Sequence, residues 1–355
     1  MGNDIYERLR GFLDTLPAGF PTTPTGVELR ILKKLFTPEE AELAMNLRSE
    51  PEDVPQIAAR MGKEGSELAS KLEEMAQKGL IFRVRQENQV LYQAWQFIVG
   101  IYEFQVKNLD SELSEMVEEY FPYFGLSMGS VRTKQLRVIP VNSAIKVLHN
   151  VTPYNKIREL VKQQNLISVM ECICRKEQKL LGKECVRPKE TCLGFGKFAQ
   201  FFIDNKLGRS ITTDEAMKIL DLAEESSLVL SPSNAQELEF VCCCCSCCCP
   251  TLRAAKLVPK SKYVISSYYQ AKIDPDLCSD CGLCIERCQV DAIQKGDGHS
   301  EIRDEKCIGC GLCVSTCPEE AISLISRPGM VDPPRDFGET LLKIEAERRT
   351  LQSKS

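Results

Sequence analysis

The sequence holds nineteen cysteines, all between positions 172 and 317, and the spacing of eight of them is its clearest chemical signal. These eight form two runs of the pattern Cys-x-x-Cys-x-x-Cys-x-x-x-Cys. The two runs are Cys278, Cys281, Cys284 and Cys288, then Cys307, Cys310, Cys313 and Cys317. Two intervening residues let three thiolates on a tight loop reach three corners of one cubane, while the fourth cysteine points towards the other half. Structural zinc sites suit isolated CxxC pairs and not such tandem runs.

These runs resemble the bacterial two-cluster ferredoxins over the segment 272–324. The resemblance implies two [4Fe-4S] clusters. Carried over by position, one cluster takes Cys278, Cys281, Cys284 and Cys317, and the other takes Cys307, Cys310, Cys313 and Cys288. Gln289 stands where a proline is usual after the fourth cysteine, whereas Pro318 keeps it. This departure bears on the rigidity of the loop and not on ligation.

A second set of four cysteines lies upstream and has the right number of thiols for one metal centre. The set is Cys172, Cys174, Cys185 and Cys192. It predicts a further iron-sulfur cluster, with an all-cysteine zinc site and free thiols as alternatives. Basic residues nearby either offset the charge of a tetrathiolate or are ordinary surface side chains; they are Arg175, Lys176, Lys179, Lys183, Arg187 and Lys189.

A third set packs seven cysteines into eight positions, and we call it the cysteine strip. The strip consists of Cys242, Cys243, Cys244, Cys245, Cys247, Cys248 and Cys249. Adjacent residues point in different directions, so one local cluster could not use all seven thiols, and two faces that feed two sites are easier to build. The strip either completes the upstream set or holds a larger or non-cubane cluster. Heterodisulfide reductases use paired cysteines for such a cluster, but the full spacing of their motif is absent here.

A glycine motif, Gly194-x-Gly196-x-x-Ala199, fits the pattern of dinucleotide-binding loops. Such a loop requires a strand immediately before it. Because Pro188 and Cys192 stand there, we expect no such strand and no nucleotide. No Walker A pattern is present either.

Composition places the protein in a reducing compartment. No apolar run approaches the ~20 residues that span a bilayer, and the charged N-terminus lacks a secretory apolar core, so we expect a cytoplasmic location without a membrane span. Cytosolic thiols stay reduced, which favours metal binding over disulfides. The net charge of −5 is mild and the charges are interspersed, so nucleic acid is an unlikely partner and a redox protein is the expected one. The sequence does not indicate the oligomeric state.

The first hundred residues predict helices followed by a hairpin, an order that looks like a winged helix. A capping box at Thr37 and Glu40 starts a helix, and helices at 54–61 and 66–78 follow. Strands are expected at 81–85 and 90–95, joined by 86–89. The helix 66–78 carries three glutamates against two lysines, which disfavours contact with DNA phosphates. Arg83 and Arg85 form a cationic pair nearby. A structural or partner-docking module is therefore the preferred interpretation over DNA binding.

The remaining chain alternates helix and strand signals and then ends in a linker and a surface helix. Helices are expected at 109–120, 153–164, 193–205 and 212–226, and strands at 136–141, 166–170 and 228–230. The predicted fold is α+β and multidomain, with a winged-helix-like domain at 1–105, an α/β cysteine-rich domain at 106–265, a ferredoxin domain at 266–326, and the linker with its helix at 327–355.

The order of these parts resembles that of a poorly characterised group of 4Fe-4S binding proteins from anaerobic microbes. The chemistry of the cysteines predicts an electron-transfer protein or subunit that relays single electrons between the two ferredoxin clusters and at least one further cluster in the middle domain. Two alternatives have their own motivation. One is an oxidoreductase that reduces a substrate at an unusual cluster in the cysteine strip, and the other is a redox-sensing regulator that acts through the winged helix.

Overall fold

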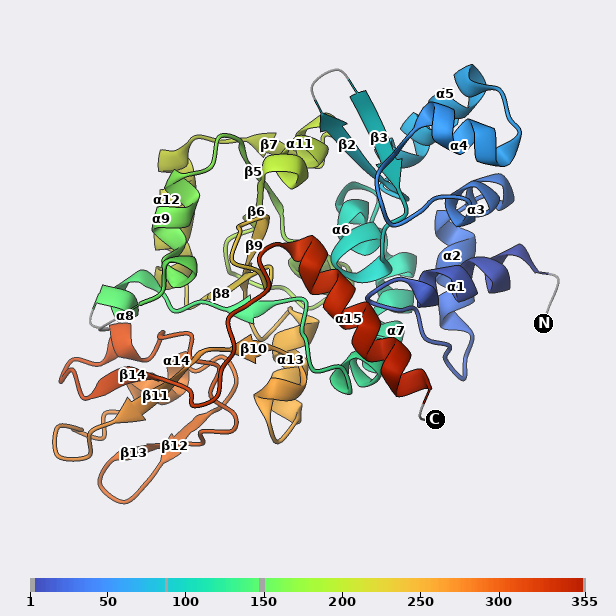
Figure 1. The fold of residues 1–355 in the computed structure, drawn as a ribbon. Helices are drawn as coiled ribbons and strands as arrows, with labels where there is room; N and C mark the ends of the chain where they lie inside the picture. Colours follow the sequence, from blue (N-terminus) through green and yellow to red (C-terminus); the bar gives the residue numbers. More distant parts are fainter. Residues whose placement is uncertain (1–3, 87–88, 147–150, 354–355) are drawn as a thin grey trace.

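The computed structural model describes residues 4–86, 89–146 and 151–353, and it combines helices with several small, mostly antiparallel sheets (Figure 1). Within these residues, none of the helices is long and apolar enough to cross a membrane.

The N-terminal part consists of helices that lead into a hairpin, as the sequence predicts. Its helices are α1 (Ile5–Thr15), α2 (Val27–Leu35), α3 (Pro38–Met45), α4 (Val54–Met61) and α5 (Gly65–Gln77). Strands β2 (Phe82–Gln86) and β3 (Gln89–Gln93) pair antiparallel, and β1 (Glu52–Asp53) adds to β3. The capping box is present, because Glu40 N donates to Thr37 Oγ1 over 3.2 Å and Thr37 N donates to the Glu40 carboxylate over 2.9 Å. The middle of the predicted 86–89 connection lies outside the described residues, and membership of the winged-helix class stays a prediction.

The middle part is built on a five-stranded sheet of order β7-β5-β6-β9-β8. The strands are β5 (Ile167–Glu171), β6 (Glu190–Phe195), β7 (Gly208–Ser210), β8 (Val229–Pro232) and β9 (Phe240–Cys244). Every pairing is antiparallel. The expected alternation of helix and strand therefore does not produce the parallel sheet of an α/β fold, and the middle part is better described as α+β.

Helices surround this sheet. They are α7 (Ser111–Gly129), α8 (Asn142–Lys146), α9 (Ile157–Lys162), α10 (Ile173–Leu180), α11 (Gly196–Asp204), α12 (Thr213–Glu225) and α13 (Pro250–Leu257). Two predicted elements are shorter than expected. The strand at 136–141 is reduced to β4 (Arg137–Val138), and the helix at 153–164 starts as a 3₁₀ turn at Pro153–Asn155 before α9 begins.

The boundary between β6 and α11 corrects the interpretation of the glycine motif. The helix expected at 193–205 begins only at Gly196, because β6 continues to Phe195, so a strand does precede the motif. Gly194 lies inside that strand, and a Cβ there would come within 2.8 Å of the Phe202 ring. This glycine therefore lets α11 pack closely on an antiparallel sheet, which is not the parallel arrangement of a dinucleotide fold.

The N-terminal and middle parts share one apolar core across the expected boundary at 105. The Phe82 ring of β2 stacks on Phe201 of α11 with centroids 4.6 Å apart, and Phe104 packs on the same Phe201 ring at 4.6 Å. The C-terminal helix α15 (Phe337–Gln352) returns to the N-terminal helices in Figure 1, where Arg348 Nη1 donates to the carbonyl of Leu16 over 2.8 Å.

The C-terminal cysteine repeats lie in a small subdomain at one end of the molecule (Figure 1). Strands β11 (Tyr269–Ile273) and β14 (Ile322–Ser326) form one antiparallel pair, and β12 (Ile293–Lys295) and β13 (Ser300–Ile302) form another. Helix α14 (Leu283–Arg287) follows the first cysteine loop. Strand β10 (Ser266–Ser267) pairs with β4, so the subdomain is tied to the middle part by backbone hydrogen bonds.

Candidate metal centres

The two cysteine loops of the C-terminal repeats turn at glycines. Gly282 and Gly311 have φ angles of 78° and 74°, in the left-handed region that favours glycine. At Gly309, with a φ of 61°, a Cβ would come within 2.2 Å of the Tyr269 carbonyl oxygen. The loop therefore lies tightly against strand β11.

One cavity in this subdomain is lined by four cysteines from both repeats, namely Cys288, Cys307, Cys310 and Cys313. Backbone amides point at two of the sulfurs. Ala271 N and Gly309 N donate to Cys307 Sγ, each over 3.4 Å, and Ala292 N donates to Cys288 Sγ over 3.2 Å. Hydrogen bonds to thiolates stabilise their negative charge and tune the potential of a cluster bound there.

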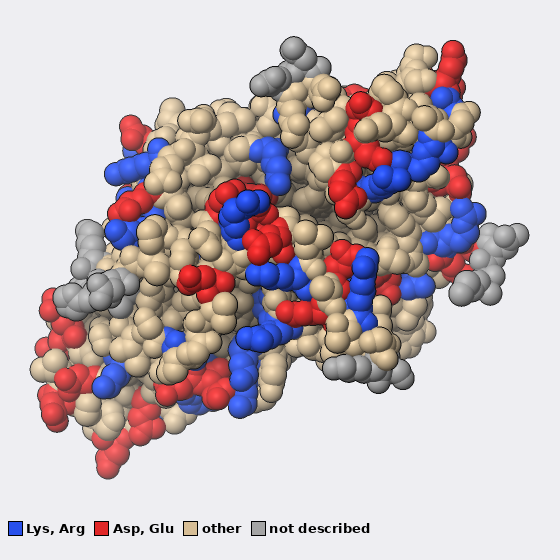
Figure 2. Space-filling view, in the orientation of Figure 1, with Lys and Arg blue, Asp and Glu red and all other residues tan. Residues whose placement is uncertain are grey.

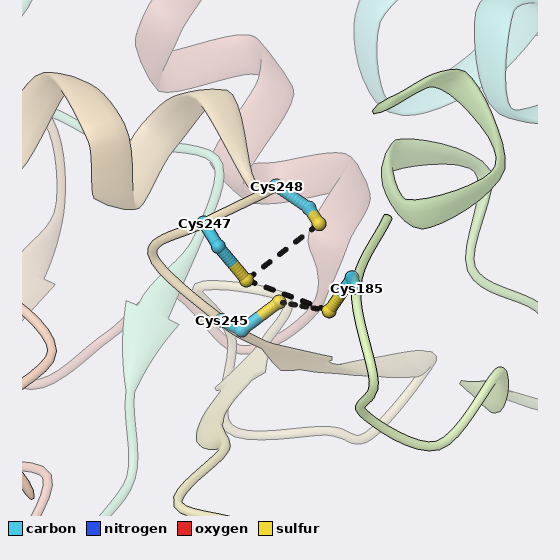
Figure 3. A group of neighbouring side chains, drawn as sticks. All are labelled: Cys185, Cys245, Cys247 and Cys248. Atoms are coloured by element: carbon cyan, nitrogen blue, oxygen red, sulfur yellow. Dashed lines mark hydrogen bonds between the residues drawn. The ribbon is translucent and has the colours of Figure 1, made fainter. Parts of the chain in front are cut away.

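The strip and the upstream set meet in a compact group, which we call the four-thiol group, formed by Cys185, Cys245, Cys247 and Cys248. Their sulfurs all lie within 4.8 Å of one another, and the side chains converge on one point (Figure 3). Cys185 Sγ is 3.5 Å from Cys247 Sγ and 3.9 Å from Cys245 Sγ, and Cys247 Sγ is 3.7 Å from Cys248 Sγ. Cys247 is exposed, whereas Cys245 and Cys248 are buried.

Six other cysteines form a second assembly, the six-thiol group: Cys172, Cys174, Cys192, Cys242, Cys244 and Cys249. Their thiols interact in neighbouring pairs, in the order Cys172, Cys174, Cys249, Cys244, Cys242, Cys192. The upstream cysteines are therefore divided, because Cys185 joins the strip in the four-thiol group while the other three join the six-thiol group. Cys243 belongs to neither group and is buried in the apolar core.

The family comparison agrees with the C-terminal geometry. Residues 271–324 match the 4Fe-4S dicluster domain family. This dicluster domain supports iron-sulfur clusters in the chain, and the cavity that draws cysteines from both repeats is consistent with crossed ligation. No curated protein and no solved structure matches the chain. The two ligand sets carried over from the ferredoxins stay predictions.

The dicluster domain contacts the cysteine strip directly. Gln289 Oε1 accepts hydrogen bonds from Ser246 N over 3.1 Å and from Ser246 Oγ over 3.2 Å. Gln289 follows Cys288, and Ser246 lies between two members of the four-thiol group. The residue that departs from the usual proline is thus a docking residue, whereas the sequence had pointed only to the rigidity of the loop.

One arginine lies between the two thiol groups. Arg175 is buried, and its guanidinium donates to Thr191 Oγ1 over 2.5 Å and to the Cys243 carbonyl over 2.8 Å. A hydrogen bond from the Cys248 thiol, assisted by Arg175, lowers the pKa of Cys245 to about 5 against the effect of burial. Of the six basic residues near the upstream set, Arg175 contacts thiols, whereas Lys179, Lys183 and Lys189 are exposed.

Two acids near the six-thiol group could not be identified from the sequence. Burial raises the pKa of Glu177 to about 7, and Tyr102 Oη donates to its carboxylate over 2.7 Å. Burial likewise raises the pKa of Glu103 to about 7, and Gly100 N donates to it over 2.7 Å. The charges of Cys172 and Cys249 raise the pKa of Glu103 further. Single glutamates on short helices give no sequence signal for such burial.

Proposed function

We propose that the chain is an iron-sulfur electron-transfer protein in which the dicluster domain exchanges single electrons with a metal centre built from the cysteine strip and the upstream cysteines. In this proposal the two dicluster ligand sets are those carried over from the ferredoxins. A redox partner protein supplies or accepts the electrons at the dicluster domain, and the cytoplasm is the expected location.

The contact between Gln289 and Ser246 carries this proposal. This contact joins Gln289, the residue after Cys288, to Ser246, the residue between Cys245 and Cys247. A cluster in the cavity lined by Cys288 is therefore separated from the cysteine strip by this one hydrogen-bonded contact. Cysteine ligands on both sides of one contact are what a relay needs.

The regulator alternative has weaker support, because the arginines of the hairpin are already engaged. Arg83 and Arg85 form ion pairs with Asp204 of α11, over 3.2 Å and 2.6 Å. Lysines and arginines are also interspersed with acidic residues over the face shown in Figure 2, without a basic stripe. We therefore propose that the N-terminal part docks on the middle part or on a partner protein. Substrate reduction at an unusual cluster stays the alternative enzyme function.

The direct test is anaerobic purification followed by iron and sulfide counting and by EPR during a redox titration. We expect at least eight irons per chain, two low-potential cubane signals, and electron transfer from the reduced dicluster domain to a further centre. Fewer than about eight irons would contradict the two clusters. If the metal centre of the middle part stays oxidised after full reduction of the dicluster domain, the relay is contradicted.

A further inference from the structure

Ten of the eleven cysteines outside the dicluster domain are divided by geometry into two arrangements with different chemical capacities, and Cys243 belongs to neither. In the four-thiol group the sulfurs converge. Four sulfurs around one tetrahedral ion with bonds of about 2.3 Å lie about 3.8 Å apart. The observed separations of 3.5, 3.7 and 3.9 Å have that scale. A cubane carries its thiolates on four different irons, which places the sulfurs further apart.

The dicluster domain provides a comparison within the same chain. Four of its eight cysteines line a cavity, and among the described residues its cysteines form no convergent group. Across the described residues, the four-thiol group is the one place where three or more cysteine, histidine or acidic ligand atoms all lie within 4.8 Å of one another. The contracted geometry therefore distinguishes this group from the sites expected to hold cubanes.

Strand pairing builds one end of the six-thiol group. Cys192 of β6 and Cys242 of β9 are direct partners in the antiparallel register. Because side chains alternate along a strand, Cys242 and Cys244 share one face while Cys243 faces the other. The thiols of Cys242 and Cys244 interact, and Cys243 packs among apolar residues of the core.

Two helix N-termini build the other end. Cys172 is the N-cap of α10, with Cys174 in its first turn, and Cys249 is the N-cap of α13. The Cys174 thiol interacts with both Cys172 and Cys249, and Cys249 interacts with Cys244. Six thiols thus form an extended row in which no three converge, so a single ion could not bind them together.

We infer that the four-thiol group binds one tetrahedral metal ion, zinc or a single iron, and that the six-thiol group is a separate site for a polynuclear iron-sulfur cluster. A single ion needs four convergent thiolates, and a polynuclear cluster can use thiolates spread along a row. Arg175 lies between the two sites and interacts with Cys245 on one side and Cys172 on the other. This assignment of metals does not depend on the electron relay, because each site is defined by its own sulfur geometry.

The test is metal analysis of anaerobically purified full-length variants. Cys185→Ser with Cys247→Ser should remove one metal ion per chain and leave the cluster iron unchanged. Cys174→Ser with Cys249→Ser should remove about four irons and their sulfide and leave the single ion bound. Cys243→Ser is the matched control, since it changes a buried cysteine of the same strip and should remove neither. Mössbauer spectra or zinc content identify the single ion as iron or zinc.

The EPR signals of the dicluster domain serve as the folding standard in each variant. Should a double variant lose them, Cys192→Ser with Cys242→Ser tests the six-thiol group from its other end, with the same expected loss. Loss of about four irons from Cys185→Ser with Cys247→Ser would overturn the single-ion site. Unchanged iron in both six-thiol variants would overturn the polynuclear site. Absence of the dicluster signals from the wild-type protein would instead contradict the electron-transfer proposal.

Discussion

Gln289 Oε1 accepts two hydrogen bonds from Ser246, one from its backbone N–H and one from its hydroxyl, and Gln289 is 6% exposed. This pair joins the dicluster domain to the cysteine strip at a point where both sides carry cysteine ligands. A residue that looked like a local departure in one cysteine loop is therefore part of an interface.

Replacement of this glutamine should disturb both stability and electron transfer. Gln289→Ala removes two hydrogen bonds from the partly buried Ser246, which should cost about 1–3 kcal/mol of the free energy of unfolding. It should also slow the reduction of the middle centre, measured by rapid freeze-quench EPR after the dicluster domain has been reduced.

Gln294→Ala is the matched control for this change, because Gln294 belongs to the same domain and hydrogen-bonds only over 3.3 Å to the exposed Glu301. If the middle centre is reduced at the same rate in the wild type and in both variants, the contact between Gln289 and Ser246 is not part of the electron path.

Arg83 should be the main ionic link between the hairpin and α11. Its side chain is 1% exposed and pairs with Glu73, Asp204 and Asn205. Arg83→Met should lower the free energy of unfolding by about 1.5–3 kcal/mol, because it removes charged hydrogen bonds to the partly exposed Glu73 and Asp204 and to the buried Asn205. The exposed Arg85, changed to Met, should cost under about 1 kcal/mol. Urea unfolding of the two variants under anaerobic conditions compares them, and equal losses would show that Arg83 is not the link.

Glu177 should make stability depend on pH. Its folded pKa of about 7 exceeds the ordinary value of 4.5, so the folded state holds a proton that the unfolded state has lost between these values. Stability therefore falls as pH rises from 4.5 to 7 and then levels off. Between pH 6 and 8 the loss from this group is about 1 kcal/mol.

Glu177→Gln keeps the shape of the side chain and removes its titration. The free energy of unfolding should therefore change between pH 6 and pH 8 by about 1 kcal/mol less in the variant than in the wild type. Glu118 and Arg253 also act on this carboxyl, and the similarly shifted Glu103 keeps part of the slope in the variant. The exposed Glu184, changed to Gln, is the control and should leave the slope unchanged. If the free energy of unfolding depends on pH equally in the Glu177→Gln variant and in the wild type, Glu177 is not the group that holds the proton.

The sequence by itself determined the local features of this protein. The two cysteine runs predicted the dicluster domain, and the capping residues Thr37 and Thr212 marked the starts of helices that the structure contains. Such signals depend on residues a few positions apart, whose interactions are formed within one loop or one helical turn.

Only the tertiary structure decided which distant cysteines meet. The chain order groups Cys185 with Cys172, Cys174 and Cys192, but folding brings Cys185 to Cys245 and Cys247 instead. The register between β6 and β9, which pairs Cys192 with Cys242, is set by the packing of whole strands and helices and not by the cysteines themselves. The same holds for the contact of Gln289 with Ser246, because two docked surfaces 43 residues apart in sequence create it.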